Sequence, residues 1–211
     1  MTQELPIFPL QLVVFPGESL NLHIFEDRYR QLINDAEAEG TTFCVPTVID
    51  NALLPIATEV RLTSVAQRYP GGESDVRTEG GRLFFLEDFW KTVPGKLYPG
   101  GRCRELEVDF QEDPDLNQEI VNLTRQIYLE LGVDKTVRNA KDGFRTYDIG
   151  HYVGLRLEEE YQLLTLLNAG DRQRFLLEHL RSIHPELREG KRIKDRALLN
   201  GHFKNLVPPK W

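Results

Sequence analysis

The chain has 211 residues, of which 40% are hydrophobic and 28% are charged, and its formal net charge is −7. This composition is typical of a globular protein that buries a substantial core, and it argues against an intrinsically disordered chain. The negative net charge argues against nucleic acid as a partner, because phosphate binding needs clustered lysine and arginine.

The chain also lacks the marks of a membrane or secreted protein. No apolar run approaches the roughly 18 residues that a membrane span needs, and the N-terminus lacks the basic cluster and apolar core of a secretion signal. Cys44 and Cys103 do not form a C-x-x-C pair, so we expect two buried free thiols. A cytoplasmic location is the simplest expectation.

The first half of the chain, up to about Phe110, has the pattern of a sheet of short strands. Two strands flank a turn at Pro16-Gly17, where proline presets one backbone angle and glycine tolerates a positive one. A helix is predicted at Glu26–Ala38, and a second turn at Glu79-Gly80-Gly81. Alternation of apolar and polar residues predicts the remaining strands at Thr42–Ile49, Ala57–Ala66, Ser74–Thr78, Arg82–Trp90, Lys96–Tyr98 and Arg102–Phe110.

From Asp113 onward the apolar spacing becomes helical. Asp113-Pro114 begins a helix, because aspartate caps the free amides and proline is tolerated at the first helical position. Gly132 is predicted to end this helix. Two shorter helices are predicted at Tyr152–Leu157 and Glu158–Leu167.

The last predicted helix is followed by a basic segment. Asp171 is predicted to cap this helix and Pro185 to end it. Residues 186–211 hold seven lysines or arginines and three acidic residues, so this stretch carries +4 and the rest of the chain −11. We expect a solvated basic tail, or one that docks on the acidic body of the chain.

The most specific string is LPIFPLQLVVFPGESLNLHIFEDRYRQL, at Leu5–Leu32. It resembles the opening of the Lon protease N-terminal (LON) domain, which starts with a PLFPL…VVFPG run and reaches an L-x-I-F-E-x-R-Y box. A leucine-rich helix, a Gly-Asp pair and an Arg-rich helix at Leu163–Leu180 resemble the end of that domain. The resemblance implies an α+β fold, with a PUA-like pseudo-β-barrel of mainly antiparallel strands, one inserted helix and a C-terminal helical bundle. It places the pseudo-barrel at residues 1–112, the helical subdomain at 113–187 and the basic tail at 188–211.

Catalytic motifs of full-length Lon proteases are missing. Their ATPase and peptidase modules do not fit in this length, and Trp90 and Leu97 stand where a GxxxxGK[ST] phosphate loop needs glycine and Ser or Thr. Lys141-Asp142-Gly143 resembles the peptidase nucleophile motif, but Phe144 follows where the serine should be. We therefore predict that the chain is not an enzyme, uses no cofactor and has no metal site, since its five histidines are scattered.

The candidate binding residues are Phe25, Glu26, Arg28 and Tyr29 in the motif box, together with Trp90. A functional interpretation makes the box part of a surface groove for extended peptides. A structural interpretation packs Phe25 and Tyr29 against the barrel and pairs Glu26 with Arg28. Trp90 ends an aromatic strand whose successive side chains point to opposite faces, so its aromatics contact the helical half or leave an apolar patch for a partner.

The resemblance implies a non-catalytic module, a substrate-recognition domain or adaptor, that binds polypeptides. Its partners would be unfolded or extended polypeptides, or a partner protein. One alternative is an RNA-binding PUA-like protein, which the basic tail supports and the acidic net charge opposes. The other is an uncharacterised hydrolase that uses the groove between the two halves.

Overall fold

The computed structural model describes the backbone of residues 2–202 and the side chains of residues 2–185 and 187–189. Its contacts divide the chain into two compact units. Unit 1 comprises Met1–Gln111 and Tyr147–Arg172, and unit 2 comprises Glu112–Thr146 and Gln173–Trp211. The predicted boundary after residue 112 lies beside the first of these divisions, whereas residues 147–172 return to unit 1. The three predicted subdomains stay a prediction.

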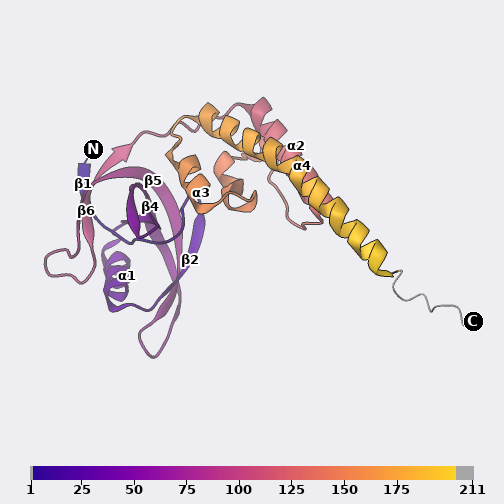
Figure 1. The fold of residues 1–211 in the computed structure, drawn as a ribbon. Coiled ribbons are helices and arrows are strands. Elements are labelled where there is room, and N and C mark those ends of the chain that lie inside the picture. The colour runs from indigo at the N-terminus through magenta and orange to yellow at the C-terminus, as the bar shows by residue number, and fades with distance from the viewer. Residues whose placement is uncertain (1, 203–211) are drawn as a thin grey trace, which may run out of the picture. The chain divides into compact units, whose positions relative to one another are not determined.

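Unit 1 is built on a sheet in which every strand pair is antiparallel (Figure 1). The strand order is β1-β6-β5-β4-β3, and β2 pairs with β5. The strands are β1 (Thr2–Pro6), β2 (Ser19–Ile24), β3 (Phe43–Ile49), β4 (Ala52–Arg68), β5 (Ser74–Trp90) and β6 (Gly100–Leu106). The predicted antiparallel sheet is confirmed. Because the order is an open path, a closed PUA-like barrel stays a prediction.

After β1 the chain leaves β6 and continues beside β3. Ile7 forms an isolated parallel bridge with Cys44, and Leu10 forms one with Thr47. The Phe8 N–H donates to the Cys44 carbonyl over 2.8 Å. The N-terminal segment therefore pairs first with β6 and then contacts β3, the strand at the opposite end of the strand order.

The core of unit 1 forms where α1 (Asp27–Glu39) packs on the sheet. Phe8 and Phe43 belong to the same buried cluster as the inner face of this helix. Gly40 ends the helix with a φ of 69°, the left-handed conformation that glycine adopts without strain. The helix lies where it was predicted, within one residue at each end. The buried residues of its inner face are Tyr29, Leu32, Ile33 and Ala36. Elsewhere in unit 1 the two cysteines are buried free thiols, as predicted.

The predicted turn at Glu79-Gly80-Gly81 is wrong, because β5 runs through these residues. A Cβ on Gly80 would lie 2.4 Å from the carbonyl oxygen of Phe15. Gly80 also exchanges main-chain hydrogen bonds with this segment, donating to Glu18 over 2.8 Å and accepting from Gly17 over 2.9 Å. Glycine is therefore needed for close approach of two backbones, which a sequence pattern does not distinguish from a turn.

Lys96–Tyr98 does not form the predicted strand either. The Lys96 N–H donates to the Val93 carbonyl over 2.9 Å, which closes a turn around Pro94-Gly95. Gly95 has a φ of 76°, as the third position of a type II turn requires. Pro16-Gly17 makes the same kind of turn, with a φ of 82° at Gly17. The predicted turn at Pro16-Gly17 is confirmed.

The second part of unit 1 packs against Phe15. The short 3-10 helix η2 (Thr146–Tyr152) places Tyr147 and His151 with ring centroids 5.2 and 4.7 Å from the Phe15 ring. A Cβ on Gly150 would lie 2.4 Å from the Phe15 Cε2 atom. Phe15 is therefore enclosed between two glycines, Gly80 and Gly150.

The helix predicted at Tyr152–Leu157 is wrong. Gly154 has a φ of 79°, which ends the helical turn there, and α3 begins three residues later as Leu157–Thr165. The hydroxyl oxygen of Tyr161 in α3 accepts a hydrogen bond from the Ile56 N–H of β4 over 2.9 Å. Residues 147–172 are thus held to the sheet by contacts of specific side chains.

His151 connects this segment to the turn at Pro16-Gly17. Its Nδ1 lies 2.9 Å from Glu160 Oε1, and its Nε2 lies 3.1 Å from Glu18 Oε2. Burial alone would lower the pKa of His151, but the hydrogen bonds to the two carboxylates outweigh it and raise the pKa to about 9. At neutral pH the ring is therefore a cation that donates to both glutamates.

Unit 2 contains α2 (Pro114–Leu131), η1 (Ala140–Asp142) and most of α4 (Ala169–His202). The Asp113 carboxylate accepts from the N–H groups of Asp115 and Leu116 over 2.8 and 3.2 Å. The predicted start of α2 is therefore confirmed, and so is its end at Gly132, whose φ is 69°. Among the described residues, none of the helices has the length and apolar character needed to cross a membrane.

Both predicted ends of α4 are wrong. The helix begins at Ala169, two residues before Asp171, and the Asn168 side chain accepts a hydrogen bond from the Asp171 N–H over 3.2 Å. Pro185 lies inside the helix, where it removes one N–H donor without ending it. Of the predicted basic tail, the backbone of residues 188–202 continues α4, and the side chains from 190 onward and residues 203–211 lie outside the described part.

Gly80→Ala tests the close approach of β5 to Phe15. We expect this variant to lose about 1–3 kcal/mol of unfolding free energy, because the new Cβ overlaps a backbone atom that has no rotamer to relax into. The matched control is Gly81→Ala, whose Cβ would meet the Glu59 carbonyl oxygen at an ordinary 3.5 Å. Urea unfolding of both variants measures the difference, and equal stability of the two would contradict the close approach.

His151 predicts a pH-dependent stability. Because its folded pKa of about 9 lies above its ordinary value of 6.5, proton binding favours the folded state, and this stabilisation is lost as the pH rises from about 6.5 to about 9. Because His151 is partly exposed, we expect its protonation to add about 1–3 kcal/mol to the unfolding free energy. Urea unfolding at about pH 6 and about pH 9.5 measures the unfolding free energy of wild type and of His151→Gln. The difference between the two proteins should be smaller at the higher pH. A difference that is unchanged or larger at the higher pH would refute the assignment.

Candidate functional site

Phe25 is an exposed aromatic residue at the junction of β2 and α1. It keeps 61% of its surface exposed. Its ring lies 6.2 Å from that of His23 in a nearly parallel arrangement. His23 in turn is fixed by Asp75, whose carboxylate lies 2.7 Å from its Nδ1. The structure therefore presents Phe25 outward on an ordered surface.

Glu26 and Arg28 form the ion pair that the structural interpretation predicted. Arg28 Nη2 lies 2.7 Å from Glu26 Oε2, and the two side chains are 46% and 41% exposed. The Arg28 guanidinium also lies 4.5 Å from the centre of the Tyr29 ring. Because the pair is exposed, it contributes little to stability and remains available to a ligand.

Tyr29 is buried beneath this surface. Only 6% of it is exposed, and its ring stacks on that of Phe8 with centroids 3.9 Å apart. Burial raises its pKa. The structure therefore brings Glu26, Arg28 and Tyr29 together beside Phe25, with Tyr29 as the support and the other three at the surface.

Trp90 lies at the end of β5, opposite Gly100 of β6. A Cβ on Gly100 would lie 2.4 Å from the Trp90 Nε1 atom, so the indole lies directly on the Gly100 backbone. Phe89, the preceding residue, is 43% exposed. The two aromatics alternate in direction, as expected for neighbours in a strand.

A groove with a volume of about 640 Å³ opens beside Trp90. One wall is β1 and the other is the loop that follows β5 (residues 91–99). The groove is lined by Glu4, Leu5, Pro6, Trp90, Thr92, Val93, Pro94 and Tyr98. Apart from Trp90, none of these lining residues was predicted; the available signal was the Pro94-Gly95 turn directly after the aromatic strand.

The loop wall is fixed to α1 through Asp35. The Asp35 carboxylate accepts from Lys96 Nζ over 2.7 Å and from the Tyr98 hydroxyl over 2.8 Å. The hydrogen bond from Lys96 lowers the pKa of Asp35, and burial followed by the Asp35 hydrogen bond raises the pKa of Tyr98 to about 12. The Leu97 N–H donates to Gln31 of the same helix over 2.6 Å. These hydrogen bonds fix the loop wall of the groove to α1.

The β1 wall also offers main-chain groups. The Ile7 N–H donates to Pro99 just before β6, and main-chain groups alternate in direction along a strand. The N–H groups of Thr2 and Glu4 therefore point away from β6. Within the described chain β1 is the end strand of the sheet, so this side is an edge to which an extended segment could add.

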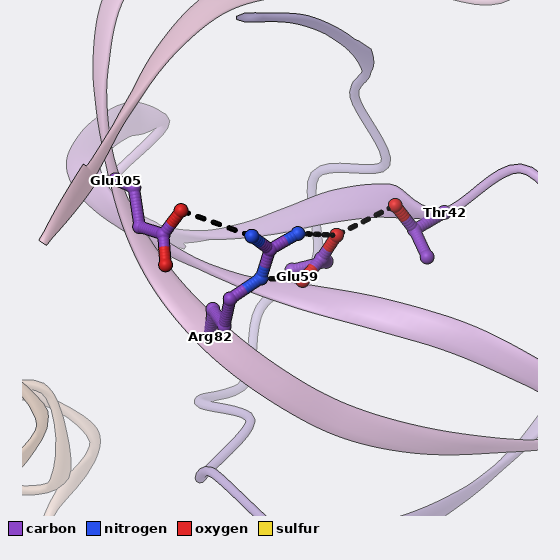
Figure 2. A network of polar contacts seen from close by, with 4 residues as sticks. All are labelled: Thr42, Glu59, Arg82 and Glu105. Atoms are coloured by element: carbon purple, nitrogen blue, oxygen red, sulfur yellow. Dashed lines mark hydrogen bonds and ion pairs between the residues drawn. The ribbon is translucent and has the colours of Figure 1, made fainter. Parts of the chain in front are cut away.

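A second polar cluster joins Thr42, Glu59, Arg82 and Glu105 (Figure 2). Arg82 donates from Nε and Nη2 to both carboxylate oxygens of Glu59, over 2.8 and 2.9 Å, and from Nη1 to Glu105 over 2.9 Å. Thr42 donates to Glu59 over 2.7 Å.

Burial would raise the pKa of Glu59, but the bonds from Arg82 and Thr42 lower it. A carboxylate with this many hydrogen bonds stays ionised, so it has no proton to donate. The cluster instead joins neighbouring strands, since Arg82 of β5 bonds Glu59 of β4 and Glu105 of β6. Among the described residues, no group of three or more His, Cys, Asp or Glu side chains is arranged to hold a metal ion.

Comparison with solved structures shows the same fold. The "Lon N-terminal domain protein from Xanthomonas campestris" is 23% identical, with a TM-score of 0.64, and the match covers 83% of this chain and 98% of that one. The "N terminal domain of Mycobacterium avium complex Lon protease" is 14% identical, with a TM-score of 0.61, and the match covers 85% and 98%.

Comparison of sequences gives the family. No curated protein matches the chain. The family described as "ATP-dependent protease La (LON) substrate-binding domain" matches residues 4–182, which include the groove, the Phe25 surface and the turn around Phe15. The protein therefore belongs to the LON substrate-binding domain family.

Proposed function

We propose that this chain is a non-catalytic module that binds unfolded or extended polypeptide segments in the groove beside Trp90. The observation that carries the proposal is the largely apolar groove between β1 and the loop that follows β5. A bound segment places its side chains in this groove. The family description, a substrate-binding domain, agrees with this use.

The Phe25 surface is a second contact region in the proposal. Phe25 offers apolar area, and Glu26 and Arg28 orient charged groups of the ligand. Tyr29 is buried, so it acts as the support of this surface rather than as a contact. Both regions border α1, which also anchors the groove wall through Asp35.

The two alternatives receive less support. The described residues that line the groove beside Trp90 include a single carboxylate and no histidine, cysteine or serine, so this groove gives no specific support to a hydrolase. An RNA-binding role would depend on the basic residues near the end of the chain, while the rest of it carries −11. We therefore propose a polypeptide or a partner protein as the ligand, and the cytoplasm as the place of action.

Trp90→Ala tests the groove. We expect the variant to bind a permanently unfolded protein, such as reduced and carboxymethylated lactalbumin, roughly tenfold more weakly, because a buried aromatic anchor contributes more than about 1 kcal/mol to an interface. Fluorescence anisotropy of the labelled unfolded protein measures the affinity, and urea unfolding confirms that the variant is folded.

The matched control for Trp90 is Phe89→Ala. Phe89 is the adjacent aromatic of the same strand, is 43% exposed and does not line the groove, so its loss should leave the affinity within about twofold of wild type. Equal affinities for Trp90→Ala, Phe89→Ala and wild type would rule out the groove as the binding site.

Arg28→Ala separates the binding and structural roles of the motif box. Since the Glu26–Arg28 pair is exposed, we expect less than about 1 kcal/mol of lost stability, together with binding of the unfolded protein weakened several-fold. The matched control is Arg61→Ala, which breaks the Arg61–Glu79 pair, whose side chains are 64% and 45% exposed. If Arg28→Ala and Arg61→Ala bind equally well, the box has no part in binding.

A further inference from the structure

The β2 strand has an open edge. Among the described residues it pairs with β5 alone. The Glu18 carbonyl accepts from the Gly80 N–H over 2.8 Å, and the Leu20 carbonyl accepts from the Thr78 hydroxyl over 2.9 Å, so both carbonyls point toward β5. Because main-chain groups alternate in direction along a strand, those of every second residue point away from β5. The residues with outward main-chain groups are Ser19, Asn21 and His23.

This edge lacks the features that protect an edge strand. The β2 sequence, Ser-Leu-Asn-Leu-His-Ile, has no Lys, Arg, Asp, Glu or Pro, the residues that hinder pairing at sheet edges. The N-terminal segment covers the outer side of β3 through bridges at Cys44 and Thr47. The β1 strand carries the charge of Glu4 and ends in Pro6. In the described chain, β2 therefore differs from β1 and β3 in having an edge that is both uncovered and uncharged.

The outward-facing residues fix how β2 pairs with a second copy of itself. An antiparallel pair that uses all of them sets Ser19 opposite His23 of the partner subunit, and Asn21 opposite Asn21 of the partner subunit. Each such pair of residues exchanges two main-chain hydrogen bonds, and no like charges meet across the strands. Two-fold symmetry lets the same surface serve both chains. The edge is therefore complementary to itself in hydrogen bonding and in charge.

The same register gives the exposed Phe25 a contact. Phe25 directly follows β2 and is 61% exposed. Continuing the register brings it to Gly17 of the partner subunit. Within the described chain, a Cβ on Gly17 would meet nothing within 4 Å, so the space beside this glycine is open to a ring. Aromatic side chains cover glycines at sheet edges in this way.

We propose that two copies of this chain form a symmetric dimer by antiparallel pairing of their β2 edges, with Asn21 at the two-fold axis. One strand pair and two Phe25 contacts make a small interface compared with the roughly 1,000 Å² that a stable complex buries. The dimer is therefore weak and dissociates on dilution, which frees Phe25. Its formation does not involve the groove beside Trp90, so it is tested separately from the proposed function.

Opposite charges at Asn21 test the two-fold axis. Sedimentation equilibrium of the full chain measures the dissociation constant, which we expect at roughly 10–100 µM. Asn21→Lys and Asn21→Glu each set two like charges opposite one another, so each should weaken the dimer roughly fivefold or more. An equimolar mixture of the two variants sets opposite charges there instead, and it should associate at least as tightly as wild type.

The matched control is Ser64→Lys. Asn21 and Ser64 are both exposed, and both pair with Arg77, from opposite sides of β5. A lysine at either position therefore meets the same charge within its own chain, but only Asn21 lies on the open edge. Ser64→Lys should leave the dissociation constant within about twofold of wild type. Urea unfolding checks that the variants fold, and Asn21→Glu gains an opposite charge beside Arg77, so it should keep its stability.

Three outcomes would overturn the inference. A wild-type chain that stays monomeric at about 500 µM would exclude even a weak dimer. A dimer that both Asn21 variants leave unchanged would use another surface. Variants that stay monomeric when mixed would contradict the two-fold register. None of these outcomes alters the proposed function, whose readout is the binding of unfolded protein by wild type and by Trp90→Ala.

Discussion

The fold of unit 1 depends on the enclosure of Phe15 between two glycines. A Cβ at Gly80 would overlap the Phe15 carbonyl oxygen, and a Cβ at Gly150 would overlap its ring. These glycines come from a strand and from a 3-10 helix that are far apart in the sequence. The polar groups around Phe15 are bonded as well: Thr58 donates to the Val14 carbonyl, and Glu18 accepts from the Phe15 N–H. The VVFPG motif is therefore a structural element that joins the sheet to residues 147–172.

The same N-terminal segment also provides the binding surface. Leu5 and Pro6 line the groove before the chain reaches the enclosed Phe15, and Phe8 supports Tyr29 beneath the Phe25 surface. The packed core fixes the residues that line the groove, so the groove is preformed. A preformed site loses less conformational entropy when an extended chain binds. The string that identifies the family thus has structural residues and candidate contact residues side by side.

Sequence patterns predicted the elements whose signals are local. α1, α2 and the turn at Pro16-Gly17 depend on apolar spacing, an aspartate cap and turn chemistry. The wrong predictions concern residues whose structural role differs from the one that their local sequence suggests. Gly80 permits close packing rather than a turn, and Pro185 lies within a helix.

Buried polar residues were beyond the reach of the sequence for the same reason. Arg172 is fully buried and donates to the carbonyls of Asp109, Leu166 and Leu167, which no spacing reveals. At the candidate site, the sequence proposed Trp90, Phe25, Glu26, Arg28 and Tyr29 as binding residues, and their role stays a prediction. It missed the groove, because the loop wall depends on Asp35 of α1 and the other wall on an edge strand.

Hydrogen–deuterium exchange of the full chain, with and without saturating unfolded lactalbumin, tests the binding surface most directly. We expect slower exchange in β1 and in the loop at 92–98, where the ligand covers the groove. We expect unchanged exchange in α2, which belongs to unit 2. Protection confined to α2 or α4, with β1 and the loop unaffected, would contradict binding in the groove.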